Sequence, residues 1–355
     1  MRTNDTVQNE VFGSLEFISE IEDVGKSFLR SRGQTIAINK SFSLLQAFIR
    51  QSKTFYEAAE VLHYRASSLN YYYSFLNLVK AYITIFEPDF VDKRVGHGIH
   101  LKPGKGALLR QFVICEKSGV FPKFYQLVTN QSLRKGIPFK IVDLLGYCTD
   151  VTWEYEQAQL GPRRIAQCKF AIVVSEDTNR LFSLLAVLNF DAIRYFKKSL
   201  EPFNNNFEEV NLPKDVAREY FNIMGEEKKH YKFFEGKSEY NFGNHDTIPT
   251  VDMIGDSHTA MKNFFMSNPY EDGFDFLLAA PLRRNLQIPM NEIIAIYLVM
   301  FFLGSLVRYR PDYLERIFAS KDAWIIERFA KAAPVTFLRY ARNLIDGRNF
   351  VYVSR

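Results

Sequence analysis

The sequence predicts a mainly α-helical protein, in which helical, bundle-like lobes pack together and a few short strands lie in the middle third. Apolar residues recur at helical spacing over residues 40–87, which indicates two or three packed helices. The uncharged run Ile293–Val307 indicates a further helix that is buried on all sides. A β-branched run, Lys169–Asp177, is the best strand candidate. Together these patterns favour helices at both ends of the chain and strands between them.

The N-terminal elements follow the same helical spacing. Residues 1–35 are polar, and within them Leu15, Ile18 and Ile21 indicate one face of a short amphipathic helix. The three consecutive tyrosines Tyr71–Tyr73 lie inside the next helical region. We interpret them as aromatic packing on the flank of a helix, because aromatic side chains bury large areas.

The middle of the chain has weaker signals. Residues 178–200 are expected to return to helix, residues 201–213 to form a loop, and residues 231–243 to form a hairpin around a turn. The two main helical regions, 40–200 and 251–345, are expected to pack into one unit. We expect an N-terminal polar segment (1–35), an N-terminal helical lobe with a basic loop (36–200), a connection with a small hairpin (201–250) and a C-terminal helical lobe (251–355).

The amino-acid composition limits which classes of protein and partner are possible. The chain has 355 residues, of which 47% are apolar and 15% aromatic, so it can build a large core. A net charge of +5 favours anionic partners without identifying nucleic acid as one of them. The cysteines Cys115, Cys148 and Cys168 are too few and too widely spaced for a disulfide scaffold or a zinc site, so we expect reduced, buried thiols and no metal or cofactor.

The sequence favours a cytoplasmic protein that does not enter a membrane. Its first residues contain no apolar region of the kind that a signal peptide carries. The apolar run Ile293–Val307 is shorter than the roughly 20 residues that a membrane-spanning helix needs.

A basic, glycine-rich stretch, "KRVGHGIHLKPGKG" at residues 93–106, is the main candidate site. It contains two histidines and no acid. A phosphate-binding P-loop would need a glycine where Ile99 stands and a hydroxyl where Gly106 stands, so that motif is absent. Glycine N–H groups together with Lys102 and Lys105 would still suit an anion. The alternative is a solvated basic turn.

Two further motifs are less specific. "EEKKHYK" puts Glu226 and His230 at a spacing that suits metal ligands on a helix, but it has no second copy, so an exposed charged helix is preferred. "VRYRP" places Arg308 and Arg310 at the end of the apolar helix, where cations stabilise a helix dipole. Alternatively, one arginine reaches back to the histidine loop, and we expect that loop to lie near Arg308.

Three stretches resemble the YaaC-like family. They are "SSLNYYYSFLNLVKAYI" (67–83), "GHGIHLKPGKGALLRQFVICEKSGVFPKFYQL" (96–127) and "YLVMFFLGSLVRYRPDYLERI" (297–317). The second contains the pattern K-x-G-x-F, and the three occur in the family's order and at similar spacing. The resemblance spans most of residues 40–345 and implies a shared fold and site more than a particular reaction.

The N-terminal half also resembles HEPN-type helical bundles, in which an arginine and a histidine form a metal-independent RNA-cleaving site, often across a dimer interface. Here Arg94 precedes His100 at a suitable distance, but the His-Gly pair of that site type is His97-Gly98. Asp92 stands five residues before His97, where HEPN enzymes carry arginine. The resemblance therefore implies a site that this sequence matches only in part.

These observations lead to two functional hypotheses. The first is a protein that binds RNA or nucleotide phosphate, with a possible metal-independent ribonuclease activity in which His97 is the general base. In that hypothesis His100 and Arg94 complete the catalytic set. The phosphate-binding residues would be Lys102, Lys105, Arg110 and Arg308.

The second hypothesis is a non-enzymatic, dimeric interaction component of a larger assembly, such as a bacterial defence system. Its aromatic-rich helices would form the interface with a second copy or with a protein partner. The sequence leaves open whether the protein is an enzyme.

Overall fold

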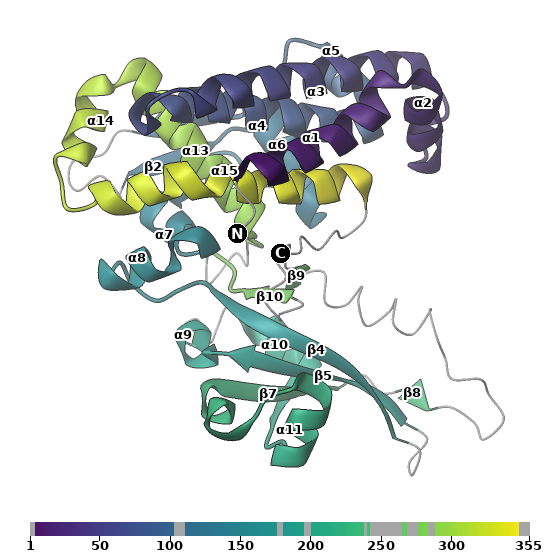
Figure 1. The fold of residues 1–355 in the computed structure, drawn as a ribbon, viewed down its shortest axis with the longest axis vertical. Coiled ribbons are helices and arrows are strands. Elements are labelled where there is room, and N and C mark those ends of the chain that lie inside the picture. Colours follow the sequence, from purple (N-terminus) through teal and green to yellow (C-terminus); the bar gives the residue numbers. More distant parts are fainter. Residues whose placement is uncertain are drawn as a thin grey trace. The chain divides into compact units, whose positions relative to one another are not determined.

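The computed structural model consists of two compact units (Figure 1). Unit 1 consists of the described residues of 1–160 and 292–350, and unit 2 consists of those of 161–291. The expected N-terminal lobe, 36–200, thus contributes to both units. The fold is mainly helical, with short antiparallel strands in the middle third, which confirms the predicted fold class. The structure describes residues 4–102, 111–175, 180–194, 200–237, 240–241, 265–267, 276–282 and 288–347.

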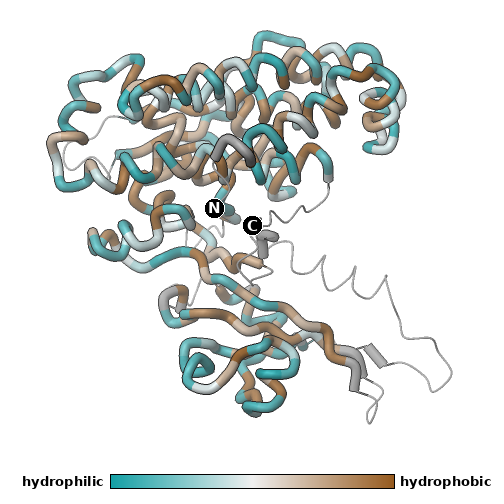
Figure 2. The backbone as a smooth tube through the Cα atoms, viewed as in Figure 1, coloured by the Kyte–Doolittle hydropathy of each residue, from teal (hydrophilic) through white to brown (hydrophobic). Residues whose placement is uncertain are grey.

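Unit 1 is a helical assembly built around α4, which contacts α3, α13 and α15. The aromatic core joins these elements; the rings of Phe75 on α4 and Phe337 on α15 stack with centroids 3.8 Å apart. Figure 2 shows hydrophobic and hydrophilic residues alternating along these helices, as amphipathic helices require. The helices are α1 (Asn4–Glu20), α2 (Glu22–Ser31), α3 (Ile38–Glu60), α4 (Tyr64–Phe86), α5 (Pro88–Asp92), α6 (Val120–Thr129), α7 (Ile141–Leu145), α8 (Thr152–Gln157), α13 (Glu292–Tyr309), α14 (Pro311–Phe318) and α15 (Ala323–Asp346).

Helix α13 is the buried helix that the apolar run predicted. Every residue from Glu292 to Leu306 is buried. At Gly304 the helix lies so close to α4 that a Cβ atom would be 3.2 Å from both the Ser68 carbonyl and Tyr72 Cβ. Among the described helices, α13 alone has the length and apolar composition to cross a membrane, and 83% of it is buried within the fold.

A small three-stranded antiparallel sheet also belongs to unit 1. Its order is β1 (Ile99–Lys102), β2 (Phe112–Cys115) and β3 (Pro138–Lys140). The pairing sets His100 opposite Ile114. The part of the basic stretch from Ile99 to Lys102 is therefore a strand, and the backbone of His100 is fixed by a regular hydrogen-bonded ladder.

A buried carboxylate ties the start of α13 to the rest of unit 1. Glu292 is fully buried and accepts hydrogen bonds from the Thr149 backbone N–H, from the Thr149 hydroxyl at 2.6 Å and from the Tyr340 hydroxyl at 2.8 Å. Burial, and secondarily the nearby Asp150, raises the pKa of Glu292 to about 7. The hydrogen bonds offset part of the cost of burying this group.

Unit 2 is built on an antiparallel sheet with strand order β6-β7-β5-β4-β10-β9, in which β8 also pairs with β5. One face packs against α9 and α10 through a cluster that includes Leu185 and Phe203, and the other packs against α11 through one that includes Leu184 and Phe221. The strands are β4 (Ile165–Ser175), β5 (Arg180–Leu188), β6 (Phe207–Val210), β7 (Tyr231–Gly236), β8 (Tyr240–Asn241), β9 (Phe265–Ser267) and β10 (Phe276–Ala279), and the helices are α9 (Phe190–Arg194), α10 (Glu201–Asn206), α11 (Lys214–Phe221) and the 3-10 helix η4 (Gly225–His230).

Several local predictions are corrected here. The expected helix over 178–200 is wrong for strand β5, because both faces of β5 are covered and its apolar run therefore lacks the alternation typical of a half-buried strand. Residues 201–210 form α10 and β6 rather than a loop. In place of a hairpin, β7 pairs with β5 and β6, and β8 pairs with β5.

Other local predictions are confirmed or corrected residue by residue. The strand predicted at Lys169–Asp177 is confirmed over residues 169–175, which belong to β4, and residues 176–177 lie outside those that the structure describes. Leu15 and Ile18 are buried on α1, but Ile21 lies beyond the helix and is 47% exposed. The three cysteines are free and buried, as expected.

The raised pKa of Glu292 predicts a pH-dependent contribution to stability. A group whose pKa is higher in the folded state stabilises the fold at low pH, and this stabilisation is lost as pH rises from about 4.5 to about 7. Glu292→Gln keeps the acceptor oxygen without the charge. We therefore expect the free energy of unfolding of this variant to change less with pH over this range than that of the parent, by roughly 1–3 kcal/mol. Urea unfolding at a series of pH values measures the difference from the parent.

The exposed Glu57 provides the control, and Glu57→Gln should leave the parent's pH profile unchanged. An identical profile for Glu292→Gln and the parent would contradict the assigned protonation of Glu292.

Candidate functional site

The glycine-rich segment around His97 is held by its own backbone carbonyls against the start of α6. The Val120 N–H donates to the Gly96 carbonyl at 3.0 Å, and the Phe121 N–H donates to the His97 carbonyl at 3.0 Å. The first N–H groups of a helix have no acceptor within the helix, so these carbonyls cap α6. The segment therefore has a defined structural role beside any role in binding.

Two glycines make this contact possible. Gly98 has φ +78° and Gly119 has φ +136°, a region that side-chain-bearing residues rarely adopt. A Cβ atom on Gly98 would be 2.4 Å from Pro122 Cδ, and one on Gly119 would be 2.3 Å from Gly98 Cα. The pattern K-x-G-x-F and the His-Gly pair are therefore two sides of one backbone contact.

A pocket of about 410 Å³ lies where this segment meets α4 and the end of α13. Its apolar wall includes Leu69, Ile99 and Phe301. Its polar groups are those of three tyrosines, two histidines, two arginines and one serine: Tyr72, Tyr73, Tyr309, His97, His100, Arg308, Arg310 and Ser305. This volume is in the range of small-molecule sites, which are mostly apolar with a few placed polar groups.

His97 is the half-buried histidine of the pocket. Its Nδ1 atom and the Tyr72 hydroxyl share a hydrogen bond of 2.6 Å, and its ring lies 5.5 Å from the Tyr72 ring. Burial, and after it the positive charges of Lys80 and Arg308, lowers the pKa of His97 below its usual value. His97 is therefore neutral near pH 7. With Nδ1 engaged by Tyr72, Nε2 is the ring nitrogen left for a ligand.

His100 stands at the exposed side of the same pocket. Its Nδ1 atom lies 2.6 Å from a carboxylate oxygen of Glu116, and the second oxygen of Glu116 lies 3.9 Å from the Lys135 ammonium. In both histidines the orientation of the ring is thus fixed through Nδ1, by a phenol in one case and by a carboxylate in the other. Such fixed rings are suited to proton transfer through Nε2.

The arginines lie at the end of α13. Arg308 donates a hydrogen bond to the Tyr73 hydroxyl, and its guanidinium carbon lies 5.0 Å from the centre of the Tyr309 ring. Arg310 donates to both carboxylate oxygens of Asp312, at 3.1 and 3.0 Å. Arg308 therefore keeps most of its N–H donors available for an anion, whereas Arg310 is partly neutralised.

The structure brings together some of the sequence-predicted site residues. His97, His100 and Arg308 line one pocket, so the expectation that the histidine loop lies near Arg308 is confirmed. Lys102 lies on β1 and lines a separate, smaller depression. Arg94 is exposed and does not line the pocket. Lys105 and Arg110 lie outside the residues that the structure describes.

Sequence reasoning missed the residues that hold the histidines. The sequence predicts only a packing role for Tyr72 and Tyr73, and both also line the pocket. The sequence pattern does not indicate a role for Glu116, because its contact with His100 depends on the pairing of β1 with β2. Within the described ranges, no group of three His, Cys, Asp or Glu side chains is placed to hold a metal ion.

A comparison with known protein families matches residues 19–345 to the family described as YaaC-like Protein. The chain belongs to the YaaC-like family. The match covers both histidines, the glycine contact and the end of α13, so the pocket lies wholly within the YaaC-like region. No curated protein and no solved structure matches the chain.

The contact between Gly98 and Gly119 predicts a specific loss of stability. Gly98→Ala must adopt a positive φ and displace Pro122, so we expect it to destabilise unit 1. Gly136 is the matched control, because it has φ +83° and open space around its Cα. The difference between Gly98→Ala and Gly136→Ala in urea unfolding should be about 1–3 kcal/mol. Equal losses of stability in the two variants would show that close packing around Gly98 does not contribute to the effect.

The charge beside His97 predicts how its pKa responds to substitution. Removing the positive charge in Arg308→Gln should raise the pKa of His97 toward about 6.5. Arg310→Gln, which removes a neighbouring charge already paired with Asp312, should change it little. NMR titration of the imidazole signal, assigned with His97→Gln, measures both effects. A His97 pKa at or above 6.5 in the parent would contradict the described environment.

Proposed function

We propose that the pocket binds a nucleotide through its phosphate and that its two histidines cleave a ribonucleotide phosphodiester without a metal ion. The observation that carries this proposal is the arrangement of His97, His100 and Arg308 in one pocket, with both imidazoles held through Nδ1. Two oriented histidines and one arginine are a sufficient set of groups for this reaction.

The lining also favours a nucleotide over other anions. Tyr72, Tyr73 and Tyr309 offer aromatic surface, on which a base or ribose can pack. Arg308 supplies a planar cation that suits phosphate oxygens. A pocket of about 410 Å³ accommodates one nucleotide, either free or as one unit of an RNA strand.

Each group has a defined task in the proposed reaction. His97 Nε2 takes the proton of the ribose 2′-hydroxyl, and the 2′-oxygen then forms a bond to phosphorus. This role requires the tautomer in which His97 Nδ1–H donates to the Tyr72 oxygen. Arg308 stabilises the charge that develops on the phosphate. The role of general acid requires the imidazolium form of His100, which gives its Nε2 proton to the 5′-oxygen as the bond from phosphorus to that oxygen breaks.

The products are a 2′,3′-cyclic phosphate and a 5′-hydroxyl. Arg94 has no task in this scheme, so the scheme differs from the arginine and histidine pairing that the HEPN resemblance implies.

A second candidate function, a non-enzymatic subunit that pairs with another copy of the chain, is favoured by one observation. Trp153 is 63% exposed, and its ring lies 5.5 Å from that of Trp324, so the two tryptophans of the sequence form an aromatic patch at the surface of unit 1. Exposed aromatic side chains are typical of interface cores. The salt dependence of binding distinguishes the two functions, because phosphate binding weakens steeply as the salt concentration rises and binding through an apolar interface does not.

The proposal predicts metal-independent cleavage of labelled single-stranded RNA in the presence of EDTA. His97→Ala should lower the rate by roughly 10²–10⁴-fold, the usual contribution of a general base. His100→Ala should also lower it. His230→Ala removes an exposed histidine of unit 2 and serves as the control that should cleave like the parent. Product analysis should detect the 2′,3′-cyclic phosphate end.

A folded His97→Ala protein that cleaves as fast as the parent would refute the mechanism. If the parent does not cleave but binds nucleotide, and Arg308→Gln weakens that binding, the phosphate site stands and the reaction is refuted.

A further inference from the structure

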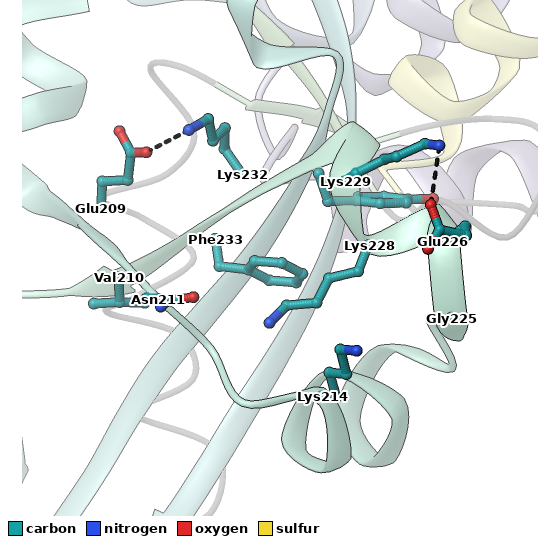
Figure 3. A pocket seen from close by; sticks show the side chains of 11 residues that line it. Glu209, Val210, Asn211, Lys214, Gly225, Glu226, Lys228, Lys229, Lys232 and Phe233 are labelled. Carbon is teal, nitrogen blue, oxygen red and sulfur yellow. Dashed lines mark hydrogen bonds and ion pairs between the residues drawn. The ribbon is translucent and has the colours of Figure 1, made fainter.

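Unit 2 contains a second pocket, of about 680 Å³, which differs in chemistry from the pocket at His97 (Figure 3). It lies among β6, β7, η4 and the start of α11. Four lysines and two glutamates line it, together with Asn211 and Gly225. The pocket at His97 combines histidines and arginines with aromatic and apolar groups, whereas this one combines four lysines with Val210, Tyr231 and Phe233. Its lysines favour an anionic ligand.

Two of the lysines carry charge that no carboxylate neutralises in the described structure. Lys214 is exposed at the start of α11 and has no ion pair there. Lys228 donates to the Leu212 carbonyl, and its ammonium lies 5.8 Å from the centre of the Phe233 ring. Figure 3 shows Lys228 extended along the Phe233 side chain, with Lys214 on the neighbouring helix. Because an ammonium has three donors, Lys228 keeps two for a ligand.

The other two lysines are held in ion pairs that are easily exchanged. Lys229 lies 3.1 Å from Glu226, and Lys232 lies 3.0 Å from Glu209. Exposed pairs of this kind contribute only about 0–1 kcal/mol, so a more highly charged ligand can replace the glutamate as partner. The paired glutamates neutralise these two lysines, which leaves Lys214 and Lys228 as the net positive charge of the pocket.

We infer that this pocket binds an anion with several linked phosphate groups. The volume exceeds that of a single phosphate several times, and a longer anion that fills it can bind Lys214 and Lys228 and also displace Glu226 and Glu209 from Lys229 and Lys232. Linked phosphates present oxygens along a chain, and lysines on η4, β7 and α11 can each bind one as a point charge. The inference does not depend on the proposed reaction at His97.

Binding of inorganic triphosphate to the full-length protein tests the inference by calorimetry at low salt. The parent for all variants carries Arg308→Gln, so that the pocket at His97 contributes little. Adding Lys214→Gln and Lys228→Gln should weaken binding by about tenfold or more, because each lost charge-assisted hydrogen bond is costly. The matched control is Arg218→Gln with Lys237→Gln, which removes two positive charges of unit 2 outside the pocket and should change the affinity less than about twofold.

The single variant Lys214→Gln keeps the test valid if the double variant misfolds, since Lys214 makes no described contact that the fold requires. This variant should weaken triphosphate binding by itself. The inference is overturned if triphosphate does not bind at low salt, if the double variant binds like its parent, or if the control weakens binding equally.

A single-stranded RNA oligonucleotide, measured in the same way, identifies the source of the phosphates. If the ligand is an RNA strand, the double variant should reduce the salt dependence of binding by about 0.7 per lost contact on a log–log plot. If triphosphate binds in the pocket and RNA is unaffected by the lysine substitutions, the ligand is a small polyphosphate. Both results support the inference.

Discussion

The first N–H groups of α6 need acceptors, and the carbonyls of Gly96 and His97 supply them. This capping contact requires the backbones of Gly98 and Gly119 to touch, and it fixes the path of the chain into β1. The position of both histidines depends on that path, because His97 lies within the cap and His100 lies on the strand that follows. Residues 96–102 of the basic stretch thus connect the start of a helix to a sheet through fixed backbone contacts.

The proposed reaction at His97 requires a rigid site. A ring held through Nδ1 by Tyr72 pays little entropy when Nε2 meets a ligand. The close approach of α13 to α4 at Gly304 places Arg308 beside that ring. The same helix packing therefore contributes to the lowered pKa of His97. The lysine pocket of unit 2 differs, since two of its four lysines are held only in exposed ion pairs with glutamates. In the two proposals, the first pocket supplies specificity through fixed groups and the second supplies attraction through charge.

The sequence predicts some parts of this structure for clear physical reasons. Helices α4 and α13 follow from long apolar patterns, and strand β4 from a β-branched run. Strand β5 could not be predicted by periodicity, because a strand covered on both faces loses its alternation. The sequence indicates His97, His100 and Arg308 because they are ionisable groups beside glycines or at a helix end. It does not indicate Tyr72 and Glu116, since their roles arise only from contacts between distant segments.

The order of the two units along the chain determines which of them can fold first during synthesis. Unit 2 is formed from residues 161–291, between the two parts of the chain that make unit 1. A nascent chain therefore releases α4 and both histidines long before α13 exists to cover them. The sheet of unit 2 has all its strands before unit 1 can close its core, and closing that core requires a long intervening loop to be bridged. The pocket at His97 is consequently among the last features to form, and a ribosome that stalls within unit 2 leaves the aromatic face of α4 uncovered.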